Sequence, residues 1–382
     1  MKKAVKRHVS LFIAVVMLAS LMSISGFAAG TAAKQYDTYT VIGDSIPAGY
    51  GLASYGSSGT GAAVSDQKQA NGTLVADSYP ALVSQAVNAS ATYQLARCGF
   101  RTTEALRMLD PNFKPDEYSD YVLANLSQVT GDAVTALKAE FAQGVKNADL
   151  ISVNLGSNDT MTFALIYMSS FLENLSAAQK NSVVMQRISL AEQQIKSLGT
   201  MGEALFNLLG AAKTLGQTGP ALAALSAGML KGYESFKQNW NILITDIKAA
   251  NPDAVILAVG MYNPFRDVKF TDASLLSVGR LADQFVGLMN VYMKTLSPCA
   301  SSYTFVSAAD AQVYTFPALT SPDFTKNFVK YVHPDKTGHA YMAQQLLAAV
   351  PAGSGAGSAP LFDLQLSGRL MSKLAAAIAA VK

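Results

Sequence analysis

A serine near the beginning of this sequence and two histidines near its end are of the residue types that cooperate in nucleophilic catalysis. Ser45 follows an apolar segment directly, in the tripeptide Gly43-Asp44-Ser45. A serine hydroxyl becomes a strong nucleophile when a base removes its proton, and histidine is the usual base because its pKa is close to neutral. Beyond residue 8, the sequence has two histidines, His333 and His339. The pattern makes Ser45 a candidate nucleophile, with helix capping as its alternative role, and leaves His333 and His339 as the candidates for the general base.

Two further residues could stabilise a negatively charged oxygen on a substrate. Such an oxygen needs preorganised hydrogen-bond donors. Asn158, in Gly156-Ser157-Asn158-Asp159, offers a side-chain amide, and Gly99 offers a backbone N–H that no side chain obstructs. Asparagine also caps helices and glycine also forms turns, so each residue has a structural alternative. Together with the N–H of Ser45 they form a candidate oxyanion hole.

The elements that must position these residues are short strands alternating with helices. Segments rich in apolar and β-branched residues predict strands at 39–42, 92–96, 150–154, 254–259 and 303–306. Helical patterns lie between them and predict helices at 79–87, 102–109, 131–143, 225–249, 276–296 and 340–349. This alternation predicts an α/β fold whose parallel sheet is covered on both faces. Ligands bind at the carboxyl ends of such strands, and Ser45, Gly99 and Asn158 each follow a strand.

The connection between the third and fourth strands is far longer than one crossover helix requires. Its composition over residues 160–240 is helical and apolar, which predicts an insertion of two or three helices. The insertion is interpreted either as a lid or acyl-binding wall over the site, or as a helical subdomain that packs on the core. Residues 353–360 predict a flexible linker, and 361–382 a helical tail.

The first 28 residues predict a secretory signal. Four basic residues precede an apolar run from Val9 to Leu21, and Gly26-Phe27-Ala28 offers small residues for cleavage. The run is short for a membrane-spanning helix, which needs about 20 apolar residues, although an uncleaved anchor is the alternative. The sequence therefore predicts an exported protein.

Without this segment, the chain no longer has more basic than acidic residues. The whole chain has 29 basic and 26 acidic residues, and the signal contains four of the basic ones, so the mature chain carries a net charge of −1. This charge gives no electrostatic case for a nucleic-acid partner. His339 has no companions at metal-ligand spacing, so no metal or cofactor is predicted. Only 14% of residues are charged and 50% are hydrophobic, which indicates a large core.

In combination, the motifs resemble those of the SGNH/GDSL-type serine esterase/lipase family in its secreted bacterial form. The resemblance is carried by four blocks in the order of the family: Gly43-Asp44-Ser45, Gly99, Gly156-Ser157-Asn158-Asp159, and His333-Pro334 with Gly338. It covers residues 36–350. The resemblance implies a flavodoxin-like three-layer α/β/α sandwich with a five-stranded parallel sheet. It also implies hydrolysis of acyl esters by Ser45 and His333, with Ser45, Gly99 and Asn158 as the oxyanion hole.

One position departs from the pattern of the family. Family members usually have an aspartate three residues before the catalytic histidine, and this sequence has Lys330. A lysine ammonium cannot accept the imidazole N–H. Asp335 and Asp323 are the nearest acids that could replace the aspartate, although Asp335 also suits a helix cap. Our hypothesis is a Ser–His dyad whose histidine is oriented by a backbone carbonyl.

The two cysteines are predicted not to form a disulfide. If the strand order is that of the flavodoxin-like fold, Cys98 ends one edge strand and Cys299 precedes the other. Four strand spacings separate these edges by about 19 Å, whereas a disulfide requires Cα atoms within about 7 Å.

Three functions remain open on the sequence. The first is a secreted esterase or lipase that acts on small-molecule or lipid esters, with lipid-interface contact through the insertion. The second is an O-acetyl esterase of cell-wall or extracellular polysaccharide. The third is a non-catalytic surface or interaction protein on the same scaffold.

Overall fold

The computed structural model describes residues 36–55, 74–127, 129–175, 182–195, 201–266, 268, 273–316 and 328–351. At its centre are five strands, β1 (Thr38–Gly43), β2 (Ala91–Gln94), β3 (Leu150–Asn154), β4 (Val255–Val259) and β5 (Thr304–Val306). They pair in parallel in the order β2-β1-β3-β4-β5. The predicted α/β fold with a five-stranded parallel sheet is confirmed.

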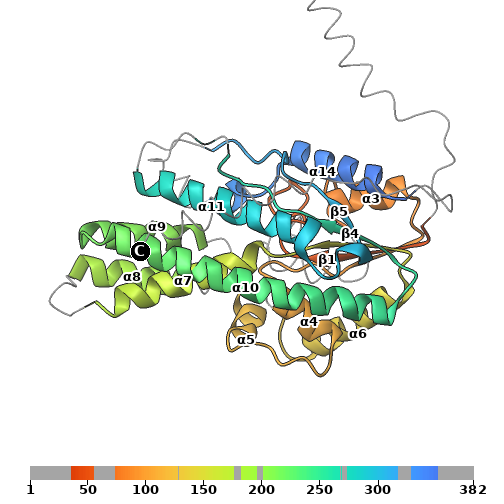
Figure 1. Cartoon of the computed structure of the whole chain (residues 1–382), viewed down its shortest axis with the longest axis horizontal. Coiled ribbons are helices and arrows are strands. Elements are labelled where there is room, and N and C mark those ends of the chain that lie inside the picture. The colour runs from red at the N-terminus through yellow and green to blue at the C-terminus, as the bar shows by residue number, and fades with distance from the viewer. Residues whose placement is uncertain are drawn as a thin grey trace, which may run out of the picture. The chain divides into compact units, whose positions relative to one another are not determined.

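Helices cover both faces of the sheet. They are α3 (Tyr79–Ala86), α4 (Thr102–Leu109), α5 (Ser119–Tyr121), the π-helical turn η1 (Val122–Leu126), α6 (Asp132–Asn147), α7 (Ser157–Glu173), α8 (Ser182–Ile195), α9 (Met201–Thr214), α10 (Thr218–Ala250), α11 (Ala273–Val291), the π-helical turn η3 (Tyr292–Leu296), the 3₁₀ turn η4 (Ala300–Ser302), α13 (Phe328–Tyr331) and α14 (Lys336–Ala349). In Figure 1, α3 and α14 lie on one side of the strands, and α4 and α6 lie on the other.

Alternation along the strands divides the core between these two layers. In β1, Tyr39 and Val41 pack among the residues of α3 and α14, whereas Ile42 packs on the opposite face with residues of α4 and α6. All five residues of β3 are buried, as expected for the middle strand of a sheet covered on both faces.

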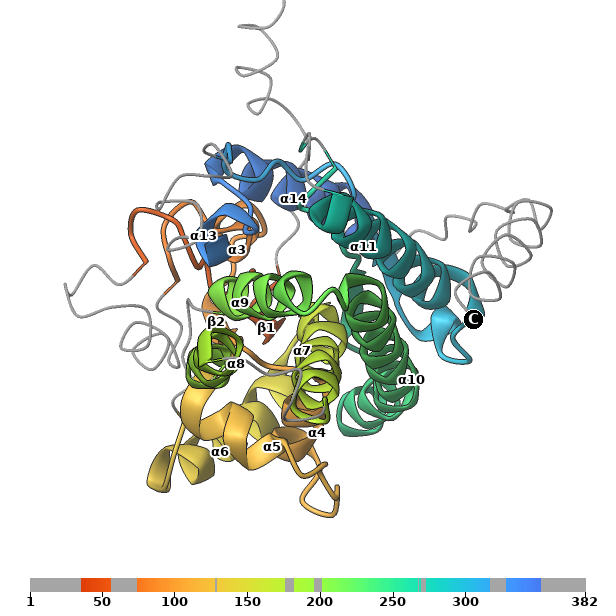
Figure 2. The same cartoon turned by 90° about the vertical axis from the view of Figure 1, so that its left-hand side faces the viewer.

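The long connection between β3 and β4 contains α7, α8, α9 and α10. Figure 2 looks onto these helices from the end of the sheet, with β1 and β2 behind them. Helix α10 packs backbone to backbone on α7: a Cβ at Gly232 would lie 2.2 Å from the carbonyl oxygen of Asp159, and one at Gly228 would lie 2.3 Å from that of Phe163. Glycine at both positions allows this close approach.

The caps explain where several helices begin. Ser78 Oγ accepts the N–H of Ala81 at the start of α3, and Pro80 occupies the first turn. Helix α14 begins four residues earlier than its pattern predicts, because Asp335 Oδ1 accepts the N–H of Gly338 at 2.8 Å. His339 therefore lies inside this helix and not in the preceding loop.

Several predicted features lie outside the described residues, namely the signal segment 1–28, the linker 353–360 and the tail 361–382. Within the described part of the chain, no helix has the length and apolar character needed to cross a membrane. Cys98 follows β2 and Cys299 precedes β5, the opposite edge strands of the sheet. Tyr55 Oη lies 2.9 Å from the Cys98 sulfur, and Thr245 Oγ1 lies 3.6 Å from the Cys299 sulfur.

Candidate active site

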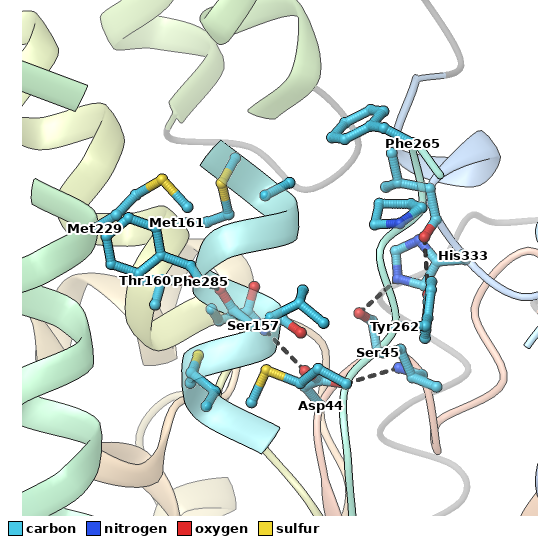
Figure 3. A pocket seen from close by; sticks show the side chains of 18 of the residues that line it. Asp44, Ser45, Ser157, Thr160, Met161, Met229, Tyr262, Phe265, Phe285 and His333 are labelled. Atoms are coloured by element: carbon cyan, nitrogen blue, oxygen red, sulfur yellow. Dashed lines mark hydrogen bonds between the residues drawn. The ribbon is translucent and has the colours of Figure 1, made fainter. Parts of the chain in front are cut away.

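Ser45 and His333 meet at the carboxyl end of the sheet although 288 positions separate them in the sequence. Ser45 Oγ and His333 Nε2 are 2.7 Å apart, and Figure 3 shows the two side chains facing each other. His333 is 7% exposed, so its imidazole is largely shielded from water. Such a pair has the geometry in which a histidine nitrogen can take the proton of a serine hydroxyl.

A tight turn after β1 places Ser45. A Cβ at Gly43 would lie 2.3 Å from Pro47 Cγ and 2.8 Å from the carbonyl oxygen of Asn154, so glycine lets the chain turn beside β3. The carboxylate of Asp44 accepts the N–H of Ile46 at 2.9 Å. The carbonyl oxygen of Ser45 accepts the N–H of Tyr50 at 3.0 Å, which closes the turn.

The histidine segment is held from three directions. Tyr262 Oη, which follows β4, donates to the carbonyl oxygen of Val332 at 2.8 Å. The ring of Tyr50 lies against the imidazole of His333, with centroids 4.8 Å apart. At Gly338, a Cβ would lie 2.0 Å from the carbonyl oxygen of Gln312, which explains the glycine in this motif. These contacts fix the ring of His333 against Ser45.

The candidate oxyanion residues line the same pocket as Ser45 and His333. Gly99 has a φ of +78°, a backbone conformation that favours glycine. Asn158 stands in the first turn of α7, and its Nδ2 donates to the carbonyl oxygen of Phe100 at 3.1 Å. The same nitrogen lies 3.4 Å from Asp44 Oδ2, which is a long hydrogen bond. Within the described residues, the amides of Ser45 and Gly99 donate to no protein acceptor.

Asp44, which lines the pocket, and Asp159 are buried carboxyl groups. Burial raises the pKa of Asp44 to about 7, and the charge of Asp159 adds to the increase. Burial likewise raises the pKa of Asp159 to about 6, although its hydrogen bonds from the N–H and hydroxyl of Thr102 oppose this change. Both groups are therefore partly protonated near neutral pH.

The pocket in front of Ser45 has a volume of about 190 Å³ and is polar at one end. Its polar lining consists of Asp44, Ser45, Ser157, Asn158, Thr160 and His333. Its apolar lining includes Met161, Met229, Met261, Phe265, Phe285 and Met289. Gly156 leaves room for this lining, because a Cβ there would lie 2.2 Å from the methyl carbon of Met261 and 2.7 Å from that of Met289. Figure 3 shows Met229 and Phe285 on the side of the pocket away from His333.

The residues considered for the third catalytic position have other roles or lie outside the described part. The ammonium group of Lys330 lies 4.9 Å from the centre of the Tyr314 ring, a cation–π contact. Asp335 caps α14. Asp323 lies outside the described residues. His339 is fully buried in α14, where its Nδ1 accepts the N–H of Tyr79 at 3.2 Å.

Tyr262 and the four pocket methionines are contributions that sequence reasoning missed. Tyr262 follows the fourth strand, but its hydrogen bond to the histidine segment has no local signature in the sequence. The methionines come from α7, α10, α11 and the end of β4, and are separated by up to 128 positions. No periodic pattern joins residues so far apart.

Comparison with known proteins gives one family and several similar structures. The family described as GDSL-like Lipase/Acylhydrolase matches residues 39–346. Curated proteins gave no match. Among solved structures, the extracellular lipase of Streptomyces rimosus is 15% identical, with a TM-score of 0.44, covering 82% of this chain and 99% of its own.

Two further solved structures are similar at comparable identity. The phospholipase A1 of Streptomyces albidoflavus is 14% identical, with a TM-score of 0.44, covering 82% of this chain and all of its own. An acetyl xylan esterase of the rumen bacterium Butyrivibrio proteoclasticus is 16% identical, with a TM-score of 0.31, covering 84% of this chain and 64% of its own. Because the family match extends from β1 to α14 and so includes the whole sheet, the chain belongs to the GDSL-like lipases and acylhydrolases and is a carboxylic ester hydrolase.

Proposed function

We propose that this protein hydrolyses acyl esters through a covalent intermediate on Ser45, with His333 as the proton carrier. The observation that carries the proposal is the 2.7 Å contact between Ser45 Oγ and His333 Nε2 at the mouth of a largely apolar pocket. A non-catalytic protein has no need to hold these two groups in hydrogen-bonding contact beside such a cavity.

The reaction takes place in two acyl-transfer steps. Ser45 Oγ attacks the ester carbonyl carbon while its proton passes to His333 Nε2. The bond between the carbonyl carbon and the alcohol oxygen then breaks, and His333 returns the proton to the departing alcohol. In the second step, a water molecule attacks the acyl-serine and gives a proton to His333. The bond to Ser45 breaks, the serine regains its proton and the carboxylic acid leaves.

Negative charge on the carbonyl oxygen in each step requires donors at the same place. Ser45, Gly99 and Asn158, whose N–H groups would supply these donors, all line the pocket. Asn158 already donates to Phe100 at 3.1 Å, so its longer contact to Asp44, at 3.4 Å, is the one that exchanges for a substrate oxygen. Partial protonation of Asp44 supports this exchange, because a neutral carboxyl group accepts a hydrogen bond more weakly than a carboxylate.

We further propose that Asp335 does not orient His333. Position 330, where the family usually has an aspartate, supplies no carboxylate either, because this chain has Lys330 there. Asp335 uses its carboxylate to cap α14, and the side chain of Lys330 is turned to Tyr314. The Tyr262–Val332 hydrogen bond and the Tyr50 ring hold the imidazole segment instead. A backbone carbonyl that accepts the second imidazole N–H would complete a Ser–His dyad.

The apolar lining favours acyl groups longer than acetyl. An acetyl group would fill only the polar end of the pocket and leave the methionine side chains without contact. Burial of acyl carbons against them stabilises bound substrate by roughly 0.8 kcal/mol per methylene. The protein is proposed to act outside the cell, after removal of residues 1–28, on small-molecule or lipid esters. Exposed Tyr167, Met185 and Leu190 on the inserted helices support contact with a lipid interface.

The test is hydrolysis of a nitrophenyl acyl ester together with labelling by a fluorophosphonate. Ser45→Ala is expected to abolish both, with turnover reduced by roughly 10⁶-fold, as for loss of a serine nucleophile elsewhere. His333→Asn should reduce turnover similarly. Ser84→Ala is the matched control, because Ser84 Oγ bonds Thr92 at 2.7 Å, outside the pocket. Full activity or labelling in the Ser45 variant would refute the assignment of the nucleophile.

A further inference from the structure

The end of the pocket opposite the Ser45–His333 pair is built from flexible and bulky apolar side chains. Met161 comes from α7, Met229 from α10, and Phe285 and Met289 from α11. Figure 3 shows Met229 and Phe285 together, across the pocket from Ser45 and His333. A carbonyl carbon held at Ser45 would therefore send its acyl chain toward these side chains.

Three of the side chains at this end of the pocket are buried. Met229 and Phe285 are each 7% exposed, and Met289 is 1% exposed. The helices that bear Met229 and Met161 are closely packed, because α10 contacts α7 at Gly228 and Gly232 without side chains between the backbones. Methionine side chains can rotate to fit a chain, but they cannot retreat far when the helices that bear them are fixed.

The volume of the pocket sets the length of the chain it can contain. An apolar cavity of about 150 Å³ accommodates benzene, which gives roughly 25 Å³ for each carbon. The 190 Å³ pocket then holds about eight carbons on the same scale. The reacting carbonyl carbon is one of these, so an acyl group of six to eight carbons, carbonyl carbon included, would fill the pocket.

We propose that Met229 and Phe285 form the end wall of an acyl pocket that selects medium-length chains, of about six to eight carbons. The proposal rests on the proposed function, because it assigns the acyl group of the same reaction. Chains shorter than this leave the wall without contact and lose binding for each missing methylene. Longer chains collide with Met229 and Phe285 and must leave the pocket or displace the helices.

The experiment measures kcat/KM for nitrophenyl esters of two to sixteen acyl carbons. For the unchanged protein, kcat/KM is expected to increase roughly fourfold per methylene up to six to eight carbons. It should then fall at least roughly tenfold by fourteen carbons, since overpacking opposes binding. Met229→Ala removes three side-chain heavy atoms and should move the optimum to longer chains by about two to four carbons. Met229→Phe, which fills the pocket further, should move the optimum in the opposite direction.

Leu230→Ala is the matched control. Leu230 follows Met229 on α10, is 38% exposed and does not line the pocket, so its substitution by alanine should leave the chain-length profile unchanged. If Met229→Ala is unstable, Phe285→Ala provides the same test from the other helix. Far-ultraviolet circular dichroism checks that each variant is folded.

Two kinds of failure are distinguishable. If no ester is hydrolysed and a fluorophosphonate does not label Ser45, the proposed function is wrong and this proposal falls with it. If esters are hydrolysed but the profile is flat or is highest for acetyl, the proposed function stands and the acyl wall is refuted. An optimum that stays in place in both Met229 variants would also refute it.

Discussion

The second histidine, His339, provides a quantitative test of how burial controls charge in this fold. Its imidazole is fully buried in α14, and its Nδ1 accepts the N–H of Tyr79 at 3.2 Å. Burial lowers the pKa of His339 to about 3, the charge of His333 adds to the decrease, and Asp77 opposes it. Burial therefore favours the neutral imidazole in the folded protein near neutral pH.

The stability of the protein should change with pH because the pKa of His339 differs between the folded and the unfolded states. In the unfolded chain, His339 binds a proton below pH 6.5, whereas in the folded protein it does so near pH 3. Its contribution to stability is therefore complete above pH 6.5 and is lost as pH falls toward 3. At 1.36 kcal/mol per pKa unit, the loss is about 3 kcal/mol at pH 4.5 and about 5 kcal/mol below pH 3.

The variant His339→Asn removes the titrating group and retains an acceptor for the N–H of Tyr79. Urea unfolding at pH 7.5 and pH 4.5 gives the free energy of unfolding of both proteins. The variant should be less stable at pH 7.5, because the smaller side chain leaves a cavity. The difference between the free energies of unfolding of the two proteins should shrink by about 3 kcal/mol at pH 4.5.

Other buried groups do not disturb this comparison. The raised pKa values of Asp44 and Asp159 have the opposite effect: their contributions are complete below pH 3.8 and are lost as pH rises through about 7 and 6. They are present in both proteins and cancel in the difference. Ester hydrolysis at pH 7.5 should persist, since His339 does not line the pocket. Parallel stability curves for the two proteins would show that burial does not depress the pKa of His339.

Four further outcomes are expected. Tyr262→Phe leaves the carbonyl of Val332 without its hydroxyl donor, so kcat should fall roughly tenfold or more with little change in KM, and unchanged kcat would count against the positioning role. Asn158→Ala should reduce kcat by about 10²–10³ while thermal unfolding shows a folded protein, and a smaller loss would remove Asn158 from the oxyanion hole. Asp335→Asn keeps a good helix cap and should change turnover less than about twofold, whereas a loss of several hundredfold would contradict the dyad. Thiol titration of the unfolded, unreduced chain should detect both Cys98 and Cys299, and a result of zero would demonstrate a disulfide.

Elements whose signals are local in the sequence were predictable. Each strand is a short apolar run, and the strand ends mark where polar chemistry can gather, so Ser45, Gly99 and Asn158 could be placed at one edge. The start of α14 was harder to predict from the sequence, since it depends on the Asp335 cap and on the close approach of Gly338 to Gln312. A prediction from the apolar residues alone therefore places the start of this helix too late in the sequence.

Contacts made across the fold could not be read from the sequence. The Tyr262–Val332 hydrogen bond joins positions 70 residues apart, and it depends on the placement of two loops after β4 and β5. The end wall of the pocket requires α10 and α11 to face each other, which no local pattern specifies. The sequence indicated an apolar insertion but could not decide between an acyl wall and a packed subdomain. The structure places Met161 and Met229 of this insertion in the lining of the pocket.

The glycine contact between α10 and α7 has a consequence for how this protein can change. Asn158 and Asp159 occupy the first turn of α7, and Gly232 of α10 lies directly on the backbone of Asp159. A tilt of α10 that widened the pocket would therefore push on the turn that bears Asn158. Adaptation to new substrates is expected to proceed by exchange of the side chains that line the pocket, while the inserted helices keep their angles.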